Sequence, residues 1–306
     1  MKNFFPEGHI INTPTNIQAK SSIRALTDAM YNNSILEAKA LMCDCNHNLY
    51  VDLGDIKGII YKDEGAIGIT EGTTKDIALI SRVNKPVCFI IKDIIETNGT
   101  YTAVLSRKEA QIKCMNEYVS KLSHGDIIDV RITHLEQFGA FCDIGCGIPS
   151  LIPIDAISVS RIFHPKDRFN VGDDIRCIVK NISDNGRITL THKELLGSWQ
   201  ENASMFKQGE TVSGIIRTVE DYGAFVELAP NLAGLAEPRA DIYPGQQASV
   251  FIKSIIPEKM KIKLVIIDAF DNKITPNKPH YFFNGTRLEY WQYSPDCCSK
   301  LIETVF

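Results

Sequence analysis

One stretch of this sequence occurs twice. Residues 125–144 and 209–228 align without a gap at a constant offset of 84 positions, so that Phe138-Gly-Ala-Phe141 returns as Tyr222-Gly-Ala-Phe225. A motif repeated at a fixed spacing indicates one structural module used more than once. The chain of 306 residues is therefore expected to form a tandem array of small modules rather than one large core.

A fainter third copy precedes these two. Leu49-Tyr-Val-Asp-Leu-Gly54 matches the segment from Ala140 to Gly145. Residues 128–133 alternate between apolar and polar side chains, which is typical of a half-buried strand. Each copy has about five such short segments, joined by turns that contain glycine, and this pattern predicts a small closed barrel.

The expected fold class is therefore all-β modules with linker helices, as three tandem five-stranded barrels. The spacing of apolar residues predicts short helices at 15–31, 107–122 and 192–206. The expected segments are an N-terminal helical extension at 1–33, a degenerate barrel at 34–113, barrels at 121–197 and 208–269, and an aromatic C-terminal tail at 270–306.

Both clear copies carry two aromatic rings three positions apart, around a glycine. Strict alternation would place Phe138 and Phe141 on opposite faces of a strand, but a bulge at Gly139 adds one residue and brings both rings to one face. Exposed rings on a barrel are suited to stacking on unpaired bases. The alternative is that these rings belong to the core of the barrel.

Cationic side chains are expected beside these rings. Arg187 follows a tight turn, Lys261 has a similar place in the third copy, and Arg131 and Arg217 alternate outward on the first strands. Arg187 and Lys261 would otherwise be ordinary solvated charges at strand ends. The loop at 161–168 is either a basic cluster that adds to the binding face or an ordinary surface loop.

At these residues the sequence resembles the S-one (S1) RNA-binding domain family, whose members are five-stranded oligonucleotide-binding (OB) barrels. The resemblance rests on the Gly-Asp opening, the Phe-Gly-Ala-Phe segment, Val171-Gly-Asp and Gly-Arg-Ile-Thr-Leu-Thr-His-Lys, and it covers about residues 34–270. The RNA-binding residues that it implies are Phe138, Phe141 and Arg187 in the second copy, Tyr222, Phe225 and Lys261 in the third, and His47 and Tyr50 in the first.

The copies depart from the family pattern at two positions. The position of the family's histidine holds Tyr61, Pro153 and Glu237 in the three copies, and Thr102 replaces the arginine in the first. The resemblance therefore implies RNA binding most clearly for the second and third copies. The first copy either binds RNA or serves as a docking module.

Catalytic and metal-binding patterns are not found. The sequence has no P-loop, nucleophile elbow, His-Glu-x-x-His motif or Rossmann glycine pattern, so we expect neither an enzyme nor a cofactor. Cys43, Cys45 and His47 would spread over about 13 Å on an extended strand, too far for one tetrahedral metal ion. Cys88 and Cys177 lie in apolar runs, as reduced cysteines do.

The charge balance restricts how RNA would be bound. The chain has a net charge of −4, and the three expected barrels carry −1, −1 and −2. Binding through stacked rings and a few placed cations is therefore expected, with a shallow dependence on salt. No apolar stretch approaches the roughly 20 residues of a membrane span, and residues 1–7 do not begin a signal peptide, so the expected location is the cytoplasm.

The function that the resemblance implies is single-stranded RNA binding, with capture of mRNA at the small ribosomal subunit during translation. The expected partners are therefore single-stranded RNA, as mRNA, and the small ribosomal subunit, without a membrane or a small-molecule substrate. The alternative is a scaffold that docks on the ribosome or RNA polymerase without binding RNA, which the negative charge and the aromatic tail favour.

Overall fold

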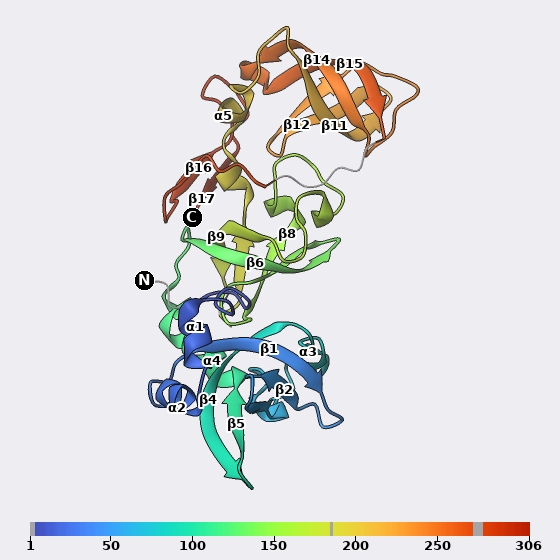
Figure 1. The fold of residues 1–306 in the computed structure, drawn as a ribbon. Coiled ribbons are helices and arrows are strands. Elements are labelled where there is room, and N and C mark those ends of the chain that lie inside the picture. The colour runs from blue at the N-terminus through green and yellow to red at the C-terminus, as the bar shows by residue number, and fades with distance from the viewer. Residues whose placement is uncertain (1–3, 184–185, 272–277) are drawn as a thin grey trace. The chain divides into compact units, whose positions relative to one another are not determined.

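The computed structural model of the chain describes residues 4–183, 186–271 and 278–306. Among these residues, the strands form three five-stranded closed barrels and one two-stranded sheet (Figure 1). The expectation of an all-β protein with five-stranded barrels is therefore confirmed.

The three barrels share one strand order. Around each barrel the strands follow the order first, second, third, fifth, fourth, and the third and fifth strands are parallel. The strands are β1 (Leu36–Cys43), β2 (Leu49–Asp52), β3 (Lys57–Ile60), β4 (Pro86–Thr97) and β5 (Thr100–Ser106) in the first barrel; β6 (Ile127–Glu136), β7 (Gly139–Asp143), β8 (Pro149–Pro153), β9 (Asp174–Ile182) and β10 (Ile188–Thr191) in the second; and β11 (Thr211–Glu220), β12 (Gly223–Ala229), β13 (Leu232–Ala236), β14 (Gln247–Ile256) and β15 (Lys261–Phe270) in the third.

Short helices lie before and between the barrels. The α-helices are α1 (Pro14–Ala19), α2 (Ile23–Tyr31), α3 (Ile77–Ile80), α4 (Arg107–Glu117) and α5 (Trp199–Ala203), and the 3-10 turns are η1 (Lys62–Glu64), η2 (Val119–Lys121), η3 (Ile154–Ala156), η4 (Pro165–Asp167), η5 (Lys193–Leu196) and η6 (Pro257–Lys259).

Two of the predicted helices are interrupted. The helix expected at 15–31 is divided into α1 and α2, because the Ser22 side chain accepts a hydrogen bond from the Ala25 amide and starts a new helix. The helix expected at 192–206 is reduced to η5 and α5. Gly197 lies between them at φ +84°, a conformation that ends a helix, and a Cβ there would meet the Phe282 ring at 2.5 Å.

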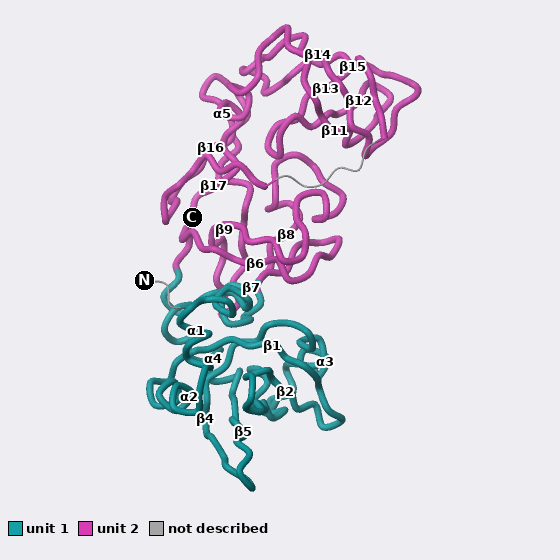
Figure 2. The backbone as a smooth tube through the Cα atoms, in the orientation of Figure 1, with its two compact units in different colours: residues 1–122, 143–149 teal, residues 123–142, 150–306 magenta. Residues whose placement is uncertain are grey.

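The chain divides into two compact units (Figure 2). The first comprises residues 1–122 with the β7–β8 loop at 143–149, and the second comprises the remaining residues. In the first unit, Leu26 of α2 packs with the apolar interior of the first barrel. The division thus does not follow the barrel boundaries, because a loop of the second barrel packs with the first unit.

A buried ionic network lies inside the first unit. Glu7 receives two hydrogen bonds from the Arg107 guanidinium, at 2.6 and 3.0 Å, and one from the Cys88 amide at 3.1 Å. The Asp143 carboxylate accepts the Glu7 amide at 2.7 Å. The N-terminal segment, α4 and the β7–β8 loop are therefore held together by hydrogen bonds to buried charges.

Glu37 makes the stability of this unit depend on pH. Burial, together with the nearby Glu7 carboxylate, raises the pKa of Glu37 from 4.5 to about 7. The folded protein thus holds this proton more tightly than the unfolded chain, and the first unit should lose stability as pH rises from about 4.5 to 7. Hydrogen exchange of strand β1 at pH 5 and pH 7.5 would measure this loss.

Glu37→Gln should reduce this pH dependence, because a glutamine oxygen can still accept the Gly8 and Ile10 amides that Glu37 accepts at 3.0 and 3.1 Å. Glu71→Gln is the matched control, since Glu71 is exposed. An equal pH dependence in the wild type and Glu37→Gln would show that Glu37 does not bind a proton in this range.

The described part of the C-terminal tail, residues 278–306, belongs to the second unit. It forms a two-stranded sheet of β16 (Tyr290–Gln292) and β17 (Glu303–Val305). Trp291 and Tyr293 are buried in the core cluster of the third barrel, and the Tyr293 hydroxyl donates to the Asn231 carbonyl at 2.7 Å. Tyr281 and Phe283 of the tail pack on the second barrel, against the cluster of Ile127, Ile178 and Leu195, so the tail packs against both barrels of this unit.

The described residues include no helix that is long and apolar enough to cross a membrane.

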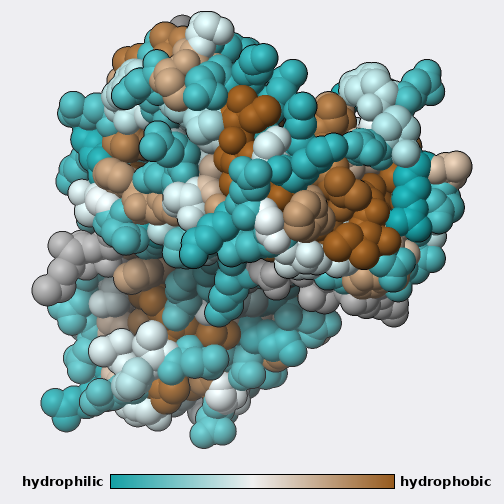
Figure 3. Space-filling view, turned by 90° about the horizontal axis from the view of Figure 1, so that it is seen from above, coloured by the Kyte–Doolittle hydropathy of each residue, from teal (hydrophilic) through white to brown (hydrophobic). Residues whose placement is uncertain are grey.

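Exposed apolar side chains of the third barrel include Ile267 and Phe270. On the face seen in Figure 3, apolar residues gather in separate patches among hydrophilic ones. All nine cysteines lie among the described residues and none forms a disulfide, and Cys88 and Cys177 are fully buried.

Candidate nucleic-acid interface

The first ring of each pair lies in a turn, not on a strand. Phe138 is the second residue of the β6–β7 turn and Tyr222 is the second residue of the β11–β12 turn. Their side chains are 57% and 63% exposed. The alternative that these two rings are barrel core is therefore wrong.

The second ring of each pair lies beside the first on the same face. Phe138 and Phe141 have ring centroids 5.9 Å apart and planes at 89°, and Tyr222 and Phe225 have centroids 6.2 Å apart and planes at 86°. Two barrels with different sequences thus build the same edge-to-face pair. Such a pair leaves aromatic surface in contact with solvent, where an unpaired base can stack.

The glycine between the rings has a different role from the predicted one. A Cβ at Gly139 would lie 2.4 Å from the Ile152 carbonyl oxygen, and one at Gly223 would lie 2.3 Å from that of Ala236. Glycine therefore lets the third strand approach the second closely. The rings share a face because the first ring lies in the turn, where strand alternation does not apply.

In the third barrel the break in register lies on β11, between Ile216 and Thr218. The expectation that Gly223 carries the bulge is therefore corrected. The extra residue on β11 is Arg217.

Arg217 was expected to be an accessible cation on the outer face of its strand, but the structure buries it. It is 8% exposed, and its guanidinium donates to the Glu227 carboxylate at 2.8 and 3.2 Å. Arg168 donates to the same carboxylate at 2.6 Å. Arg217 is thus committed to a buried ion-pair network within the second unit.

Arg131 remains half-exposed and is paired with Asp174 by two hydrogen bonds of 2.8 Å.

The third barrel places a lysine in line with its inner ring. Phe225 is paired with Leu235 on β13, and Leu235 is paired with Lys263 on β15, so the three side chains form a row across the sheet. Lys261 lies two residues earlier on the same strand and is also exposed. The binding face of this barrel therefore offers two lysines beside the ring pair.

The second barrel has a matching row with fewer charges. Leu151 is paired with Thr189, which takes the place of Lys263. Arg187 precedes Thr189 by two residues, as Lys261 precedes Lys263, and it is exposed. The turn that leads to Arg187 includes residues 184–185, which lie outside the described part of the chain.

His134 is a site residue that the sequence pattern did not reveal. Its ring stacks on Phe141 at a centroid distance of 6.3 Å and an angle of 29°. Its Nε2 lies 2.6 Å from the Glu136 carboxylate. Strict alternation from Ile132 would turn His134 inward, so no periodicity in the sequence pointed to it.

The corresponding face of the first barrel carries two carboxylates, Asp44 and Asp76, and Asp76 is paired with Lys62 at 2.7 Å. His47 lies in the β1–β2 loop, and its Nδ1 is 3.1 Å from the Asp76 carboxylate, while the Tyr50 hydroxyl donates to Asp44 at 3.4 Å. Tyr50 is paired with Ile59, so it occupies the row position of Phe225. Carboxylates beside both positions oppose the approach of a phosphate.

The basic loop at 161–168 divides between two roles. Arg161 is exposed and lies over the Phe163 ring, with 5.9 Å from the guanidinium carbon to the ring centroid. Arg168, at its other end, belongs to the buried network with Glu227. Within the described residues, no group of three histidine, cysteine or acidic side chains is arranged to hold a metal ion.

Comparison with known proteins identifies the class of module. Residues 121–193, which include the strands of the second barrel, match the S1 RNA binding domain family. The chain therefore contains an S1 RNA-binding domain, and the resemblance expected from the motifs around Phe138 and Arg187 is confirmed there.

Most of the chain is similar to small ribosomal subunit protein bS1. The bS1 of Staphylococcus aureus (strain COL) is 27% identical over 283 residues, which cover 87% of this chain and 70% of the relative. The bS1 of Rhizobium meliloti (strain 1021) is 26% identical over 248 residues, 71% of this chain and 43% of the relative. Among solved structures, a multidomain protein with nucleic acid binding domains from Streptococcus pneumoniae is 13% identical to this chain. The match covers 77% of this chain and 74% of that protein. Its TM-score of 0.25 is too low to support a structural argument.

Proposed function

We propose that this chain binds single-stranded RNA through the aromatic faces of its second and third barrels and acts with the small ribosomal subunit in translation. The observation that carries the proposal is the edge-to-face ring pair, repeated in the same turn of both barrels. The S1 domain and the similarity to bS1 support it. It would act in the cytoplasm as a binding protein and not as an enzyme.

The finer division of labour is also part of the proposal. All three barrels are S1-type modules with the same strand order. The second barrel binds through Phe138, Phe141 and Arg187, and the third through its ring pair and two lysines. Each face alone binds weakly, and the linkage of two faces on one strand raises the overall affinity.

The first barrel is assigned a different role. Since Asp44 and Asp76 flank the positions where the other barrels carry exposed rings, this barrel docks on protein and does not hold RNA. The scaffold function considered from the sequence thus applies to one module of an RNA-binding chain.

A salt titration tests the proposal. The full chain should bind an unstructured RNA, and the cations of the two aromatic faces should contribute roughly −2 to the slope of log K against log salt, because about three of them contact phosphates at about 0.7 each. Fluorescence anisotropy of a labelled RNA at several salt concentrations measures both quantities. A fully base-paired RNA is the control and should bind more weakly. Absence of binding to the unstructured RNA at low salt would refute the proposal.

A further inference from the structure

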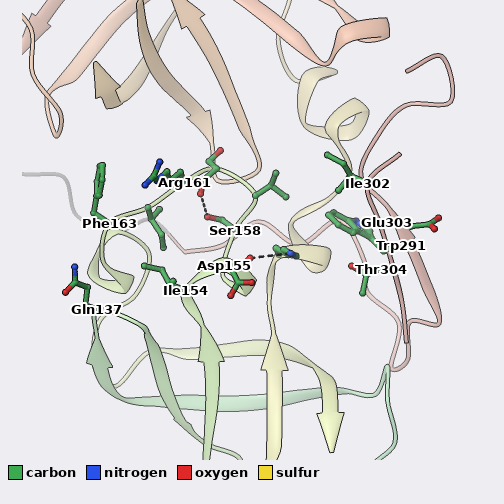
Figure 4. Close-up of a pocket in the computed structure, with 14 residues that line it drawn as sticks. Gln137, Ile154, Asp155, Ser158, Arg161, Phe163, Trp291, Ile302, Glu303 and Thr304 are labelled. Carbon is green, nitrogen blue, oxygen red and sulfur yellow. Dashed lines mark hydrogen bonds between the residues drawn. The ribbon is translucent and has the colours of Figure 1, made fainter. Parts of the chain in front are cut away.

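A pocket of about 570 Å³ lies in the second unit. Residues of the β6–β7 turn, of the segment 154–163 and of the C-terminal sheet line it (Figure 4). Its volume is within the roughly 300–1,000 Å³ typical of small-ligand sites. Gln137 lines the pocket and directly precedes Phe138 in the β6–β7 turn. The pocket therefore begins where the aromatic face ends.

The indole of Trp291 forms part of the pocket wall. Trp291 lines the pocket and is 8% exposed. Its Nε1 is buried and has no hydrogen-bond partner among the described residues, so the ring, and not the N–H, faces the pocket.

Two cations face the same space. Arg161 and Phe163 lie on one side of the pocket, opposite Trp291 and Thr304 (Figure 4). Lys193 lines the pocket as well, and its ammonium donates to the Asp155 carbonyl at 3.3 Å. Neither Arg161 nor Lys193 forms an ion pair with a carboxylate of the described residues, so both can bind phosphate.

The acidic residues of the lining do not cancel these charges. Glu303 already accepts the Tyr290 hydroxyl at 2.8 Å, and Figure 4 shows its carboxylate directed away from Ser158. Asp155 is exposed, and its carboxylate can accept the amino group of a base. Cations, an acceptor and aromatic rings together match a nucleotide, which has a phosphate, a polar edge and a π face.

We propose that this pocket holds one nucleotide of an RNA strand that leaves the aromatic face at Phe138. Arg161 and Lys193 contact its phosphates, and the nucleotide lies against the indole ring of Trp291. The inference rests on the proposed function, because the strand must first occupy the Phe138–Phe141 face. The C-terminal sheet thereby becomes part of the RNA site.

The chain has two tryptophans, so fluorine NMR of 5-fluorotryptophan protein can observe the pocket directly. An unstructured RNA of about 12 nucleotides should shift the Trp291 signal and leave the buried Trp199 signal in place. The Trp291→Phe variant assigns the two signals. Millimolar UMP should leave both signals unchanged, and a Trp291 shift with UMP but not with the RNA would overturn the inference.

A charge-removal pair gives a second measurement. Arg161→Gln with Lys193→Gln should make the slope of log K against log salt shallower by about 1.4, the amount for two phosphate contacts. Lys121→Gln with Lys207→Gln removes two exposed charges outside the pocket and should leave the slope unchanged.

The outcomes separate the two proposals. No binding of the RNA by the wild type would mean that the proposed function fails. The pocket inference alone would be overturned by a different set of results. In that case Phe141→Ala weakens RNA binding, but the RNA does not shift the Trp291 signal. The slope of log K against log salt is then also the same in both charge-removal variants.

Discussion

Replacing Phe141 and Phe225 together by alanine should weaken the binding of unstructured RNA at least about 25-fold. Each stacked base contributes about 1–3 kcal/mol, so the loss of one ring from each pair removes about 2–6 kcal/mol of binding free energy. The two rings have equivalent places in edge-to-face pairs on different barrels. Fluorescence anisotropy with the double variant and both single variants measures the effect.

Tyr31→Ala is the matched control, since Tyr31 is a highly exposed ring on α2, outside the candidate face. Phe141 and Phe225 are half-buried, so thermal unfolding of each variant must show that the barrels remain folded. Affinity of the folded double variant within about twofold of the wild type would refute base stacking at these rings and favour a scaffold function.

Arg107→Met should lower the free energy of unfolding of the first unit by about 3–5 kcal/mol. Burial by itself would raise the pKa of Glu7, but the guanidinium groups of Arg107 and Arg82 hold this pKa below its usual value. Without Arg107, the Glu7 carboxylate would remain buried with little compensation, which is the costly way to break a buried ion pair. Hydrogen exchange of strands β1 and β4 measures the loss locally.

Lys92→Met is the control in the same unit. Lys92 pairs with Glu64 and Glu109 at 3.1 and 2.9 Å where all three side chains are partly exposed, so its removal should cost no more than about 1 kcal/mol. The double variant Glu7→Gln with Arg107→Met should recover part of the stability because residue 7 then no longer carries an unpaired buried charge. An equal effect of Arg107→Met and Lys92→Met would contradict a structural role for the buried pair.

The aromatic half of the binding face could be predicted because it is encoded locally. Phe138 and Phe141 lie within one turn and one strand, and their repeat as Tyr222 and Phe225 marks them as a shared feature. Since a short segment sets their geometry, a sequence motif suffices to place them. The reason for Gly139 was missed because it depends on the carbonyl of Ile152, on another strand.

The cationic half could not be predicted to the same extent. Arg217 and Lys261 looked alike in the sequence, as basic residues on strands of the same barrel. Arg217 is instead buried against Glu227, which also pairs with Arg168, 59 residues earlier in the chain. The alternation rule predicts which face of a strand a residue occupies, but not which distant segment of the fold covers that face.

The sequence by itself determined the modular plan: barrels of alternating strands, and a ring pair carried by the same turn in two of them. Only the tertiary structure decided which charges remain accessible, that Trp291 of the tail is buried beside a pocket, and that His134 stacks on Phe141. The physical reason is that strand pattern and turn geometry are local, whereas the exposure of a charge or an indole depends on partners from distant segments that the fold brings together.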